Sequence, residues 1–459
     1  MINTLIEAFR LGPAPRLALV GAGGKSTSLF RLAGEFPAPL LLGSTAHLAL
    51  EQSREVDRHI VVQSPADIPA VAAPGRTLFT GADNDHGRWK GLPSEALPAL
   101  QRLADDLQVP LLFESDGSRC LPVKAWETYE PPIPPFAETV VVCAGLSALG
   151  QALDEAHVFH ASIFSQLSGL ALGEPLTAAA LAAVLAHPGG GQKNIPAGAR
   201  RICLLNQADT PALQAQAQQM VPILLGAFDA VVIASLKQAQ AAPRGRKTPG
   251  GPGPFSGIHA VYEAEAGVIL AAGGASRMGQ PKLLLPWRGE ALIRHSARTA
   301  LQAGLNPVVV VTGAGAENVA AALAGLPVKL VHNPDWKNGQ STSVRAGLAA
   351  LPPQTGAAAF LLGDQPQIPE TLVRALLERH RRTLAPITVP LIGQQRGNPA
   401  LFDRATFPEF FALEGDAGAR QIFSRHTLDY LPWHDQSLLM DVDTPEDYDR
   451  LTRGNLPGE

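Results

Sequence analysis

The amino-acid sequence predicts an α/β protein with two domains built on mostly parallel sheets, and three features lead to this prediction. Short, nearly continuous apolar runs alternate with amphipathic, alanine-rich stretches along the whole chain, which is typical of strands that helices cover on both faces. The length of 459 residues is more than a single hydrophobic core usually serves. A segment rich in Gly and Pro also interrupts the chain near its middle.

The interrupting segment, AAPRGRKTPGGPGPFSG at 241–257, holds nine Gly or Pro among its seventeen residues, and three of the others are basic. Such a segment cannot bury apolar surface and is typical of a linker. We therefore predict a first domain at residues 1–240, a linker at 241–262 and a second domain at 263–459, each domain large enough for its own core.

Apolar runs mark the expected strands. In the first domain they are 16–20, 39–44, 59–63, 109–115, 139–144, 201–206 and 230–235. In the second they are 267–272, 307–313, 328–333, 357–364 and 385–391. Ligands of parallel sheets bind beyond the carboxyl ends of the strands, so the residues that directly follow a strand are the candidates for function.

Composition excludes several classes of protein. The net charge of −4 and the lack of a Lys/Arg run predict no nucleic-acid binding. Cys120, Cys143 and Cys203 lie too far apart for a disulfide framework or a metal motif, which fits a reducing compartment. No apolar run approaches the roughly 18 residues of a membrane span, and the N-terminus lacks the apolar core of a signal peptide. We expect a cytoplasmic protein that binds no membrane.

A glycine-rich loop, LAAGGASRMGQPK at 270–282, follows the strand at 267–272. Its small residues let the backbone amides of 272–276 fold closely around a polyanion. Arg277 can bind a terminal phosphate through two parallel hydrogen bonds, and Lys282 supplies a compact positive charge. Taken alone, the loop fits a flexible connection equally well.

Three aspartates complement this loop. Asp364 ends an apolar strand, and Asp441 and Asp443 precede the last expected helix. Carboxylates of this kind are suitable ligands for the Mg²⁺ that accompanies a triphosphate. A helix cap is the alternative role for Asp364, whereas Thr444, with Asp447 three residues later, is the better cap of the last helix.

Six ordered motifs in residues 266–452 resemble the molybdenum-cofactor nucleotidyltransferases of the MobA/MocA kind. The motifs are LAAGGASRMGQPKLLLPWRGEALI, NGQSTSVRAGL, LLGDQP, RGNPALF, GDAGAR and MDVDTPEDY. The resemblance implies a Rossmann-like nucleotidyltransferase domain with a mostly parallel sheet, which transfers CMP from CTP to a molybdopterin-type molybdenum cofactor with Mg²⁺ and releases pyrophosphate. LAAG is typical of the members that use CTP; guanylyl transfer from GTP and nucleotidyl transfer to a sugar or polyol phosphate remain alternatives.

The resemblance also implies roles for individual residues. The catalytic set is Arg277, Lys282 and Asp364, and the metal ligands are Asp364, Asp441 and Asp443. The nucleotide contacts are Leu270, Ala271, Ala272, Gly273, Gly274, Ser276, Ser341 and Ser343. The acceptor side holds Arg396, Asn398, Asp416 and Arg420. Ser341 and Ser343 fall at an expected helix N-terminus, so N-capping is an equally good account of either serine.

The first domain contains a second glycine loop, LVGAGGKST at 19–27. It is a shortened variant of the P-loop pattern, because Leu19 stands where that pattern has Gly. A strand before it and an amphipathic helix after it predict a P-loop-like α/β domain. Glu114 or Asp116 could act as the magnesium ligand, and a structural turn is the alternative. The expected phosphate site, open to ATP or GTP as a second nucleotide, is Gly21, Gly23, Gly24, Lys25, Ser26, Thr27 and Asp116.

Two further features of this domain leave alternatives open. LLNQAD at 204–209 is similar to a guanine-reading motif in which Asn206 and Asp209 would contact the base, but Gln207 replaces the usual lysine and a strand-end turn fits as well. His47 follows the strand at 39–44 and is expected to be part of the hydrogen-bonded structure rather than a ligand.

The pieces VGAGGKST, STAHL, FESDGSRCLPVKA and LLNQADT, spread over 16–210, resemble YqeC, an accessory protein of selenium-dependent molybdenum hydroxylases. Together the two resemblances imply a bifunctional chain in the maturation of a molybdenum hydroxylase, with the apo-hydroxylase as partner. The alternative outside the enzymes is a carrier that inserts finished molybdenum cofactor and uses a nucleotide as a switch.

Overall fold

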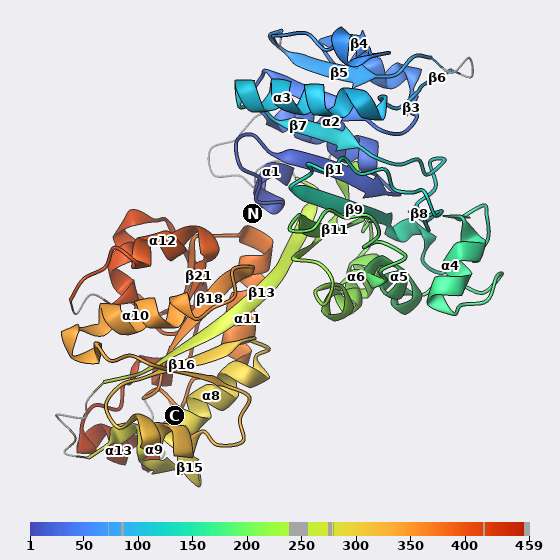
Figure 1. Cartoon of the computed structure of the whole chain (residues 1–459). Helices are drawn as coiled ribbons and strands as arrows, with labels where there is room; N and C mark the ends of the chain where they lie inside the picture. The colour runs from blue at the N-terminus through green and yellow to red at the C-terminus, as the bar shows by residue number, and fades with distance from the viewer. Residues whose placement is uncertain are drawn as a thin grey trace. The chain divides into compact units, whose positions relative to one another are not determined.

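A computed structural model describes residues 1–71, 73–83, 87–237, 256–273, 278, 280–415 and 418–453. The chain forms two compact units, Met1–Tyr262 and Glu263–Glu459 (Figure 1). Each unit is a sheet with helices packed on it, so the predicted α/β fold class is confirmed. No described helix combines the length and the apolar character that crossing a bilayer requires.

The sheet of the first unit consists of parallel strands throughout its described pairings. The strand order is β12 (Ala230–Ala234), β11 (Arg200–Asn206), β9 (Thr139–Gly145), β1 (Arg16–Gly21), β7 (Leu111–Glu114), β2 (Leu40–Ser44), β5 (Arg76–Thr80) and β4 (Arg58–Val61). Runs of Val, Leu and Ile form the central strands because both faces of the sheet are buried. Strand β5 was not predicted, since RTLFT contains too few apolar residues for a visible run.

Helices cover both faces of this sheet. They are α1 (Leu5–Ala8), α2 (Lys25–Glu35), α3 (Leu97–Leu107), α4 (Ala161–Ser168), α5 (Ala178–Ala186) and α6 (Pro211–Leu224). Residues of α3 to α6 share one core cluster with Ala18 and Val20 of β1. Leu17 and Leu19 alternate with them and are equally buried, and α2 contacts β1 and β7. Side chains of a strand point alternately to its two faces, which places α2 on the opposite side.

The sheet of the second unit is mixed. Its order is β17 (Lys329–His332), β16 (Val308–Thr312), β13 (Ile258–Ala271), β18 (Thr355–Leu362), β21 (Ala400–Asp403), β19 (Ile387–Ile392) and β22 (Leu428–Trp433), with β20 (Gln395–Arg396) also on β19. Among the described pairings of this sheet, those of β21 with β18 and β19 and of β20 with β19 are antiparallel. The sheet is therefore mostly parallel, as predicted, although β21 and β22 were not anticipated.

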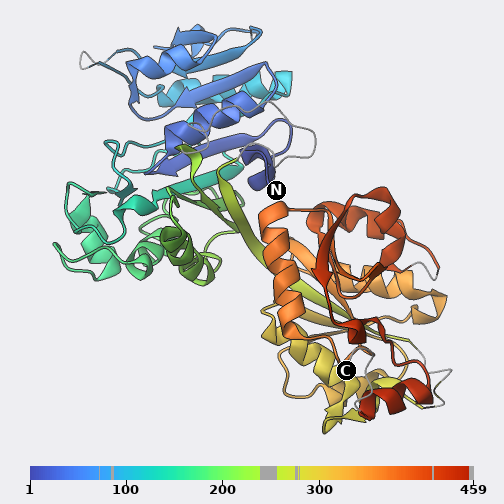
Figure 2. The same ribbon diagram turned by 180° about the vertical axis from the view of Figure 1, so that it is seen from behind.

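Two layers of helices enclose this sheet, as the front and back views show (Figures 1 and 2). The first layer is α8 (Leu292–Gln302), α9 (Ala316–Ala322) and α11 (Glu370–Thr383), which pack with Ile269 of β13. The second is α10 (Gln340–Ala349) and α12 (Phe407–Phe410), which pack with Val268. Val268 and Ile269, which are neighbours in β13, thus pack into the cores on opposite faces of the sheet. The last helix, α13 (Pro445–Thr452), belongs to a smaller cluster around Trp287 and Met440.

Among the described residues, six short strands pair outside the main sheets. They are β3 (Leu48–Ala49), β6 (Arg88–Trp89), β8 (Val123–Lys124), β10 (Val158–Phe159), β14 (Pro286–Trp287) and β15 (Glu290–Ala291).

The end of the predicted linker needs a correction. Residues 258–262 were assigned to the linker, but they form the beginning of β13, next to β12 in the first unit. Ile258, Ala260 and Val261 are buried there, and the burial of these side chains favours a strand over a solvated linker. The rest of the predicted linker, apart from residues 256 and 257, lies outside the described residues.

Candidate functional site

The parallel strands β13, β16 and β18 end at one edge of the second sheet, where a cleft opens. The cleft has a volume of about 430 Å³. It is lined by Leu270, Ala271, Ala272, Gly273, Lys282, Leu283, Trp336, Lys337, Gly339, Gln340, Ser343, Leu362 and Asp364. Several residues predicted for the nucleotide and for catalysis thus line one cavity at the carboxyl ends of the strands, which is the position that open α/β sheets use for ligands.

Lys282 lies between two of the predicted aspartates. Its Nζ atom is 2.6 Å from Oδ2 of Asp364 and 2.7 Å from Oδ1 of Asp443. Burial alone would lower the pKa of Lys282, but the charges of Asp364 and Asp443 outweigh it and raise the pKa above its ordinary value. The lysine is therefore a positive charge in the lining of the cleft, held by residues far apart in the sequence.

Asp441 is attached to the same cluster through a glutamine. Nε2 of Gln365 donates a hydrogen bond to Oδ1 of Asp441. Loss of hydration and then the negative charge of Asp364 raise the pKa of Asp441. Among the described residues, however, no three His, Cys, Asp or Glu side chains form a group ready to hold a metal ion. The three predicted ligands, Asp364, Asp441 and Asp443, are near one another, and the ammonium group of Lys282 lies between Asp364 and Asp443.

None of the three aspartates is the N-cap of the helix that follows it. Helix α11 begins at Glu370 with Pro369 as its N-cap, so Asp364 does not cap it. Thr444 caps α13 and forms a capping box with Asp447, as predicted. Asp441 and Asp443 are left without a capping role.

Helix α10 begins at the cleft, as expected for the segment with Ser341 and Ser343. Its N-cap is Gly339, with a φ of 106° and no side-chain cap, so neither serine acts as the cap. Nδ2 of Asn333 donates to Oγ of Ser343 at 2.9 Å. The Oγ atom of Ser341 is fully buried and has no hydrogen-bond partner among the described residues.

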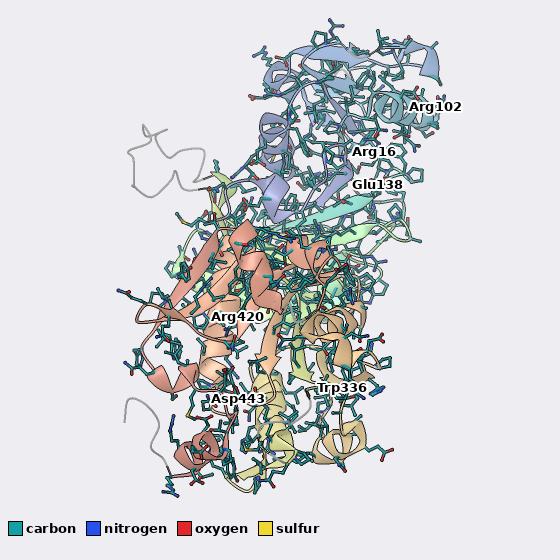
Figure 3. All side chains as sticks on the ribbon, turned by 90° about the vertical axis from the view of Figure 1, so that its left-hand side faces the viewer. Arg16, Arg102, Glu138, Trp336, Arg420 and Asp443 are labelled. Atoms are coloured by element: carbon teal, nitrogen blue, oxygen red, sulfur yellow. The ribbon has the colours of Figure 1, made fainter. Side chains whose placement is uncertain are left out.

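The predicted acceptor residues are only loosely gathered. Nη2 of Arg420 is 3.4 Å from Oδ1 of Asn398. The guanidinium of Arg396 lies 5.5 Å from the centre of the Phe423 ring. Figure 3 labels Arg420, Asp443 and Trp336, all in the second unit. Both arginines are exposed, so they are accessible to an anionic ligand.

Some predicted residues of this site fall outside the described residues, namely Gly274, Ser276, Arg277 and Asp416. Sequence reasoning missed Trp336, Lys337 and Gln340, which line the cleft, and Gln365, which holds Asp441. Trp336 and Lys337 directly precede the predicted NGQSTS motif and Gln365 directly follows Asp364. Their position in or beside a predicted motif could have identified them from the sequence.

The glycine loop of the first unit joins β1 to α2. Gly21, Gly23 and Gly24 all have positive φ, at 95°, 71° and 142°. A Cβ atom on Gly23 would overlap with the backbone of Gly145, and one on Gly24 would overlap with the Asn206 side chain. The loop therefore requires glycine for its conformation and for its packing.

Lys25, at the start of α2, is buried within the first unit. Its Nζ atom lies 2.5 Å from the carbonyl oxygen of Gly21 and 3.2 Å from Oδ1 of Asp116. Burial opposes the charged form of Lys25, but Asp116 and Glu114 outweigh this effect and raise its pKa. In this conformation the ammonium group of Lys25 is held by the Gly21 carbonyl oxygen and by Asp116.

Asp116 is saturated by protein partners. The backbone N–H of Gly21 and Nε1 of Trp126 donate to its carboxylate, and the ammonium groups of Lys25 and Lys124 lie 3.2 Å away. Glu114 has a different surrounding: Oγ of Ser26 donates to its Oε2 at 2.8 Å, and burial raises its pKa. Of the two acids that the sequence offered as magnesium ligands, Glu114 is the one that contacts the loop hydroxyl.

Two residues of the possible base-reading motif in the first unit, Asn206 and Gln207, form hydrogen bonds with other protein groups. Nδ2 of Asn206 donates to the carbonyl oxygen of Gly23, and its Oδ1 accepts from the backbone of Leu236. Oε1 of Gln207 accepts from Ser147. Asn206 therefore holds the loop in place. Asp209 and His47 are exposed, and Thr27 is half-buried on the first turn of α2.

Comparison with known proteins assigns a family to each unit. Residues 267–430 match the MobA-like NTP transferase domain, and residues 17–162 match the YqeC protein family. Both resemblances drawn from the sequence are confirmed. The second unit is accordingly of the nucleotidyltransferase type.

Each of the following relatives matches half of the chain or less. The chain is 37% identical over 196 residues to the nicotine blue oxidoreductase of Paenarthrobacter nicotinovorans (40% of this chain, 95% of the relative). It is 30% identical over 235 residues to the uncharacterized protein YqeC of Escherichia coli K12 (50% and 90%), and 27% identical over 182 residues to the molybdenum cofactor cytidylyltransferase of the same organism (39% and 92%). The crystal structure of Rv0371c from Mycobacterium tuberculosis H37Rv is 31% identical, with a TM-score of 0.38, over 41% of this chain and 98% of that chain.

Proposed function

Because the chain belongs to the MobA-like NTP transferases through its second unit and to the YqeC family through its first, we propose that it transfers CMP from CTP to a molybdopterin-type molybdenum cofactor. The terminal phosphate of the pterin would attack the α-phosphorus of CTP, and the bond to the pyrophosphate leaving group would break. The relative named molybdenum cofactor cytidylyltransferase, 92% of whose length is covered by the match, supports this choice of substrate.

The observation that carries the proposal is the contact of Lys282 with Asp364 and Asp443 at the edge of the cleft. Phosphoryl and nucleotidyl transfer depend mainly on positioning and on neutralising charge. In the proposed mechanism Lys282 neutralises the charge that develops at the α-phosphate. The backbone amides that begin at Ala272 hold the β- and γ-phosphates, and Arg277 binds the leaving pyrophosphate.

The residues present suit a bound Mg²⁺. Asp364, Asp441 and Asp443 would hold it, and oxygen atoms are the donors that this cation prefers. The buried Oε1 of Gln365, which has no hydrogen-bond partner among the described residues, is a further oxygen beside them. Bound there, the cation would offset the negative charge of the triphosphate and of the leaving pyrophosphate.

The choice of CTP depends on Ala272, a buried residue that directly follows strand β13. In the proposed complex its methyl group narrows the space for the base next to the backbone of β13, which favours the smaller pyrimidine. Steric differences of this size discriminate only modestly, so GTP-dependent transfer and a sugar- or polyol-phosphate acceptor are the competing outcomes of the test.

The first unit supplies a second proposal, a site for the phosphates of ATP or GTP at the start of α2. The contact of Ser26 with Glu114 favours it, because a loop hydroxyl and an acid at the end of the neighbouring strand are suitable partners for a nucleotide-bound Mg²⁺. Equilibrium dialysis with labelled ATP and GTP tests this, with Glu114→Gln as the variant expected to lose binding.

In the cell, an apo molybdenum hydroxylase is the proposed partner of the chain.

The experiment that tests the main proposal is pyrophosphate release by the purified chain. The reaction contains molybdopterin-bound molybdenum and Mg²⁺, with CTP, GTP or ATP in parallel. Pyrophosphate release with CTP supports CMP transfer. Release with GTP alone rejects CMP transfer and supports guanylyl transfer. No release, combined with tight binding to an apo-hydroxylase, favours the carrier. Because one relative is named an oxidoreductase, oxidation of added NADH or NADPH without pyrophosphate release would also contradict the proposal.

A further inference from the structure

The ammonium group of Lys282 has the surroundings of a metal ion. Two carboxylate oxygens, from Asp364 and Asp443, lie within 2.7 Å of Nζ. One carboxylate follows strand β18 and the other precedes α13, so the lysine is the centre that joins the two segments. Carboxylates converging from separate segments on one positive centre are also the usual protein contribution to a Mg²⁺ site.

The neighbouring oxygen atoms fit the same picture. Gln365 is 2% exposed, its Nε2 donates to Asp441, and its Oε1 has no hydrogen-bond partner among the described residues. A buried carbonyl oxygen without a donor is costly, and a cation or its bound water would satisfy it. The described residues nevertheless hold no ready group of three ligands, and Lys282 engages two of the aspartates.

We propose that Lys282 is an internal cation that occupies Asp364 and Asp443 until a metal ion and a nucleoside triphosphate arrive together. This inference rests on the proposed nucleotidyl transfer at the same cleft. An ammonium and a divalent cation repel each other and cannot share the same two oxygens. The lysine also lines the cleft, where the phosphates would offer it a new partner. Nucleotide binding then frees the aspartates, and the two ligands promote each other's binding.

Binding of Mn²⁺ alone to the full chain tests the proposal, measured by the loss of the free-ion electron paramagnetic resonance signal. Lys282→Met removes the competing charge and keeps a side chain of similar length. We expect this variant to bind Mn²⁺ at least about tenfold more tightly than the wild-type chain, a difference of about 1.4 kcal/mol. Lys282→Gln serves as a second variant, and thermal unfolding of each shows that the fold is retained.

Lys337→Met is the matched control. Lys337 lines the same cleft, but its Nζ atom lies 5.5 Å from the Trp336 ring centre, and no described contact joins it to a carboxylate. The control loses the same charge without releasing an aspartate, so its Mn²⁺ affinity should stay close to that of the wild type. Unchanged affinity in both Lys282 variants overturns the proposal, and so does an equal gain in the control.

The test is independent of the proposed reaction, because the assay contains neither nucleotide nor pterin. Tighter Mn²⁺ binding by Lys282→Met together with no pyrophosphate release from CTP in the wild type would keep the internal cation and reject CMP transfer. Pyrophosphate release from CTP together with unchanged Mn²⁺ affinity would keep CMP transfer and reject the internal cation.

Discussion

Each glycine loop of the chain is followed by a lysine whose charge is balanced by aspartate, but the two lysines differ in exposure. Lys25 is 4% exposed and bound to Asp116 and to the carbonyl oxygen of Gly21. The side chain of Lys282 is 20% exposed and lies at a cleft. Moving a deeply buried charge away from its partners is costly. We therefore interpret Lys25 as part of the structure in this conformation and Lys282 as a group that can change partners.

Asp364→Asn tests the assignment of Asp364 to catalysis. The amide keeps the shape of the side chain but removes the charge that faces Lys282. We expect turnover to fall on the order of 10²- to 10³-fold, as when one group that stabilises charge in the transition state is removed. Steady-state pyrophosphate release measures the loss, and urea unfolding shows whether stability is kept.

Asp449→Asn is the control for this change. Asp449 is exposed on α13 and pairs with Arg453, and a surface pair of this kind contributes little. Its turnover should equal that of the wild type. Substantial residual activity of Asp364→Asn would remove Asp364 from the catalytic set.

His259 gives the first unit a predictable pH dependence. Burial lowers the pKa of His259 below the ordinary value of 6.5, and its Nε2 lies 2.9 Å from Oγ of Ser235. A lowered folded pKa means that the unfolded chain binds the proton more readily. The contribution of His259 to stability is therefore complete above pH 6.5 and is lost as the pH falls below that value.

The measurement is the free energy of unfolding of wild type and His259→Gln at several pH values between neutrality and pH 5. We expect the wild-type value, relative to the variant, to fall as the pH decreases. A difference between the two proteins that stays constant with pH would contradict the pKa direction.

At the scale of elements, the loop between β1 and α2 depends on glycine. In Gly23→Ala the new methyl group would overlap with the backbone of Gly145, at a φ of 71° that favours glycine. We expect a loss of about 2 kcal/mol in the free energy of unfolding of the first unit. Urea unfolding followed by circular dichroism measures it.

Gly34→Ala is the matched control in the neighbouring helix. Gly34 lies inside α2, and a Cβ atom there would meet nothing within 4 Å. Alanine in a helix is better than glycine, so this variant should gain about 0.5–1 kcal/mol. Equal destabilisation by both substitutions would show that the loop has no special requirement.

Which elements could be predicted from the sequence depended on their burial. The central strands β1, β9, β11 and β16 are apolar on both faces and gave clear runs. Strands β5, β21 and β22 were missed, since each is only four to six residues long and its sequence, RTLFT, ALFD or LDYLPW, includes polar residues. Such strands are stabilised by their neighbours in the sheet rather than by a local pattern.

At the scale of the whole molecule, the two units have separate cores. The described residues of 263–459 form hydrophobic clusters of their own, three of which have no member before residue 263. We expect this part alone to unfold cooperatively and to release pyrophosphate from CTP at a rate similar to that of the full chain. Calorimetry and the pyrophosphate assay check the two statements. Aggregation, or a folded part without activity, would show that the second unit needs residues 1–262.

The sequence by itself determined the α/β class, the two glycine loops and the acids that follow strands, because hydrophobic runs and loop composition are local properties of the chain. It predicted that Lys282, Asp364 and Asp443 share one site from their residue types and positions beside expected strands and helices, and from the resemblance to a family, but not which atoms would be in contact. The tertiary structure decided that Lys282 lies between those two aspartates, that Asp116 is saturated and that Glu114 contacts Ser26. The pairs Lys282–Asp364, Lys282–Asp443, Gly21–Asp116 and Ser26–Glu114 are separated by 82 to 161 positions in the sequence. Only tertiary packing brings such distant residues together.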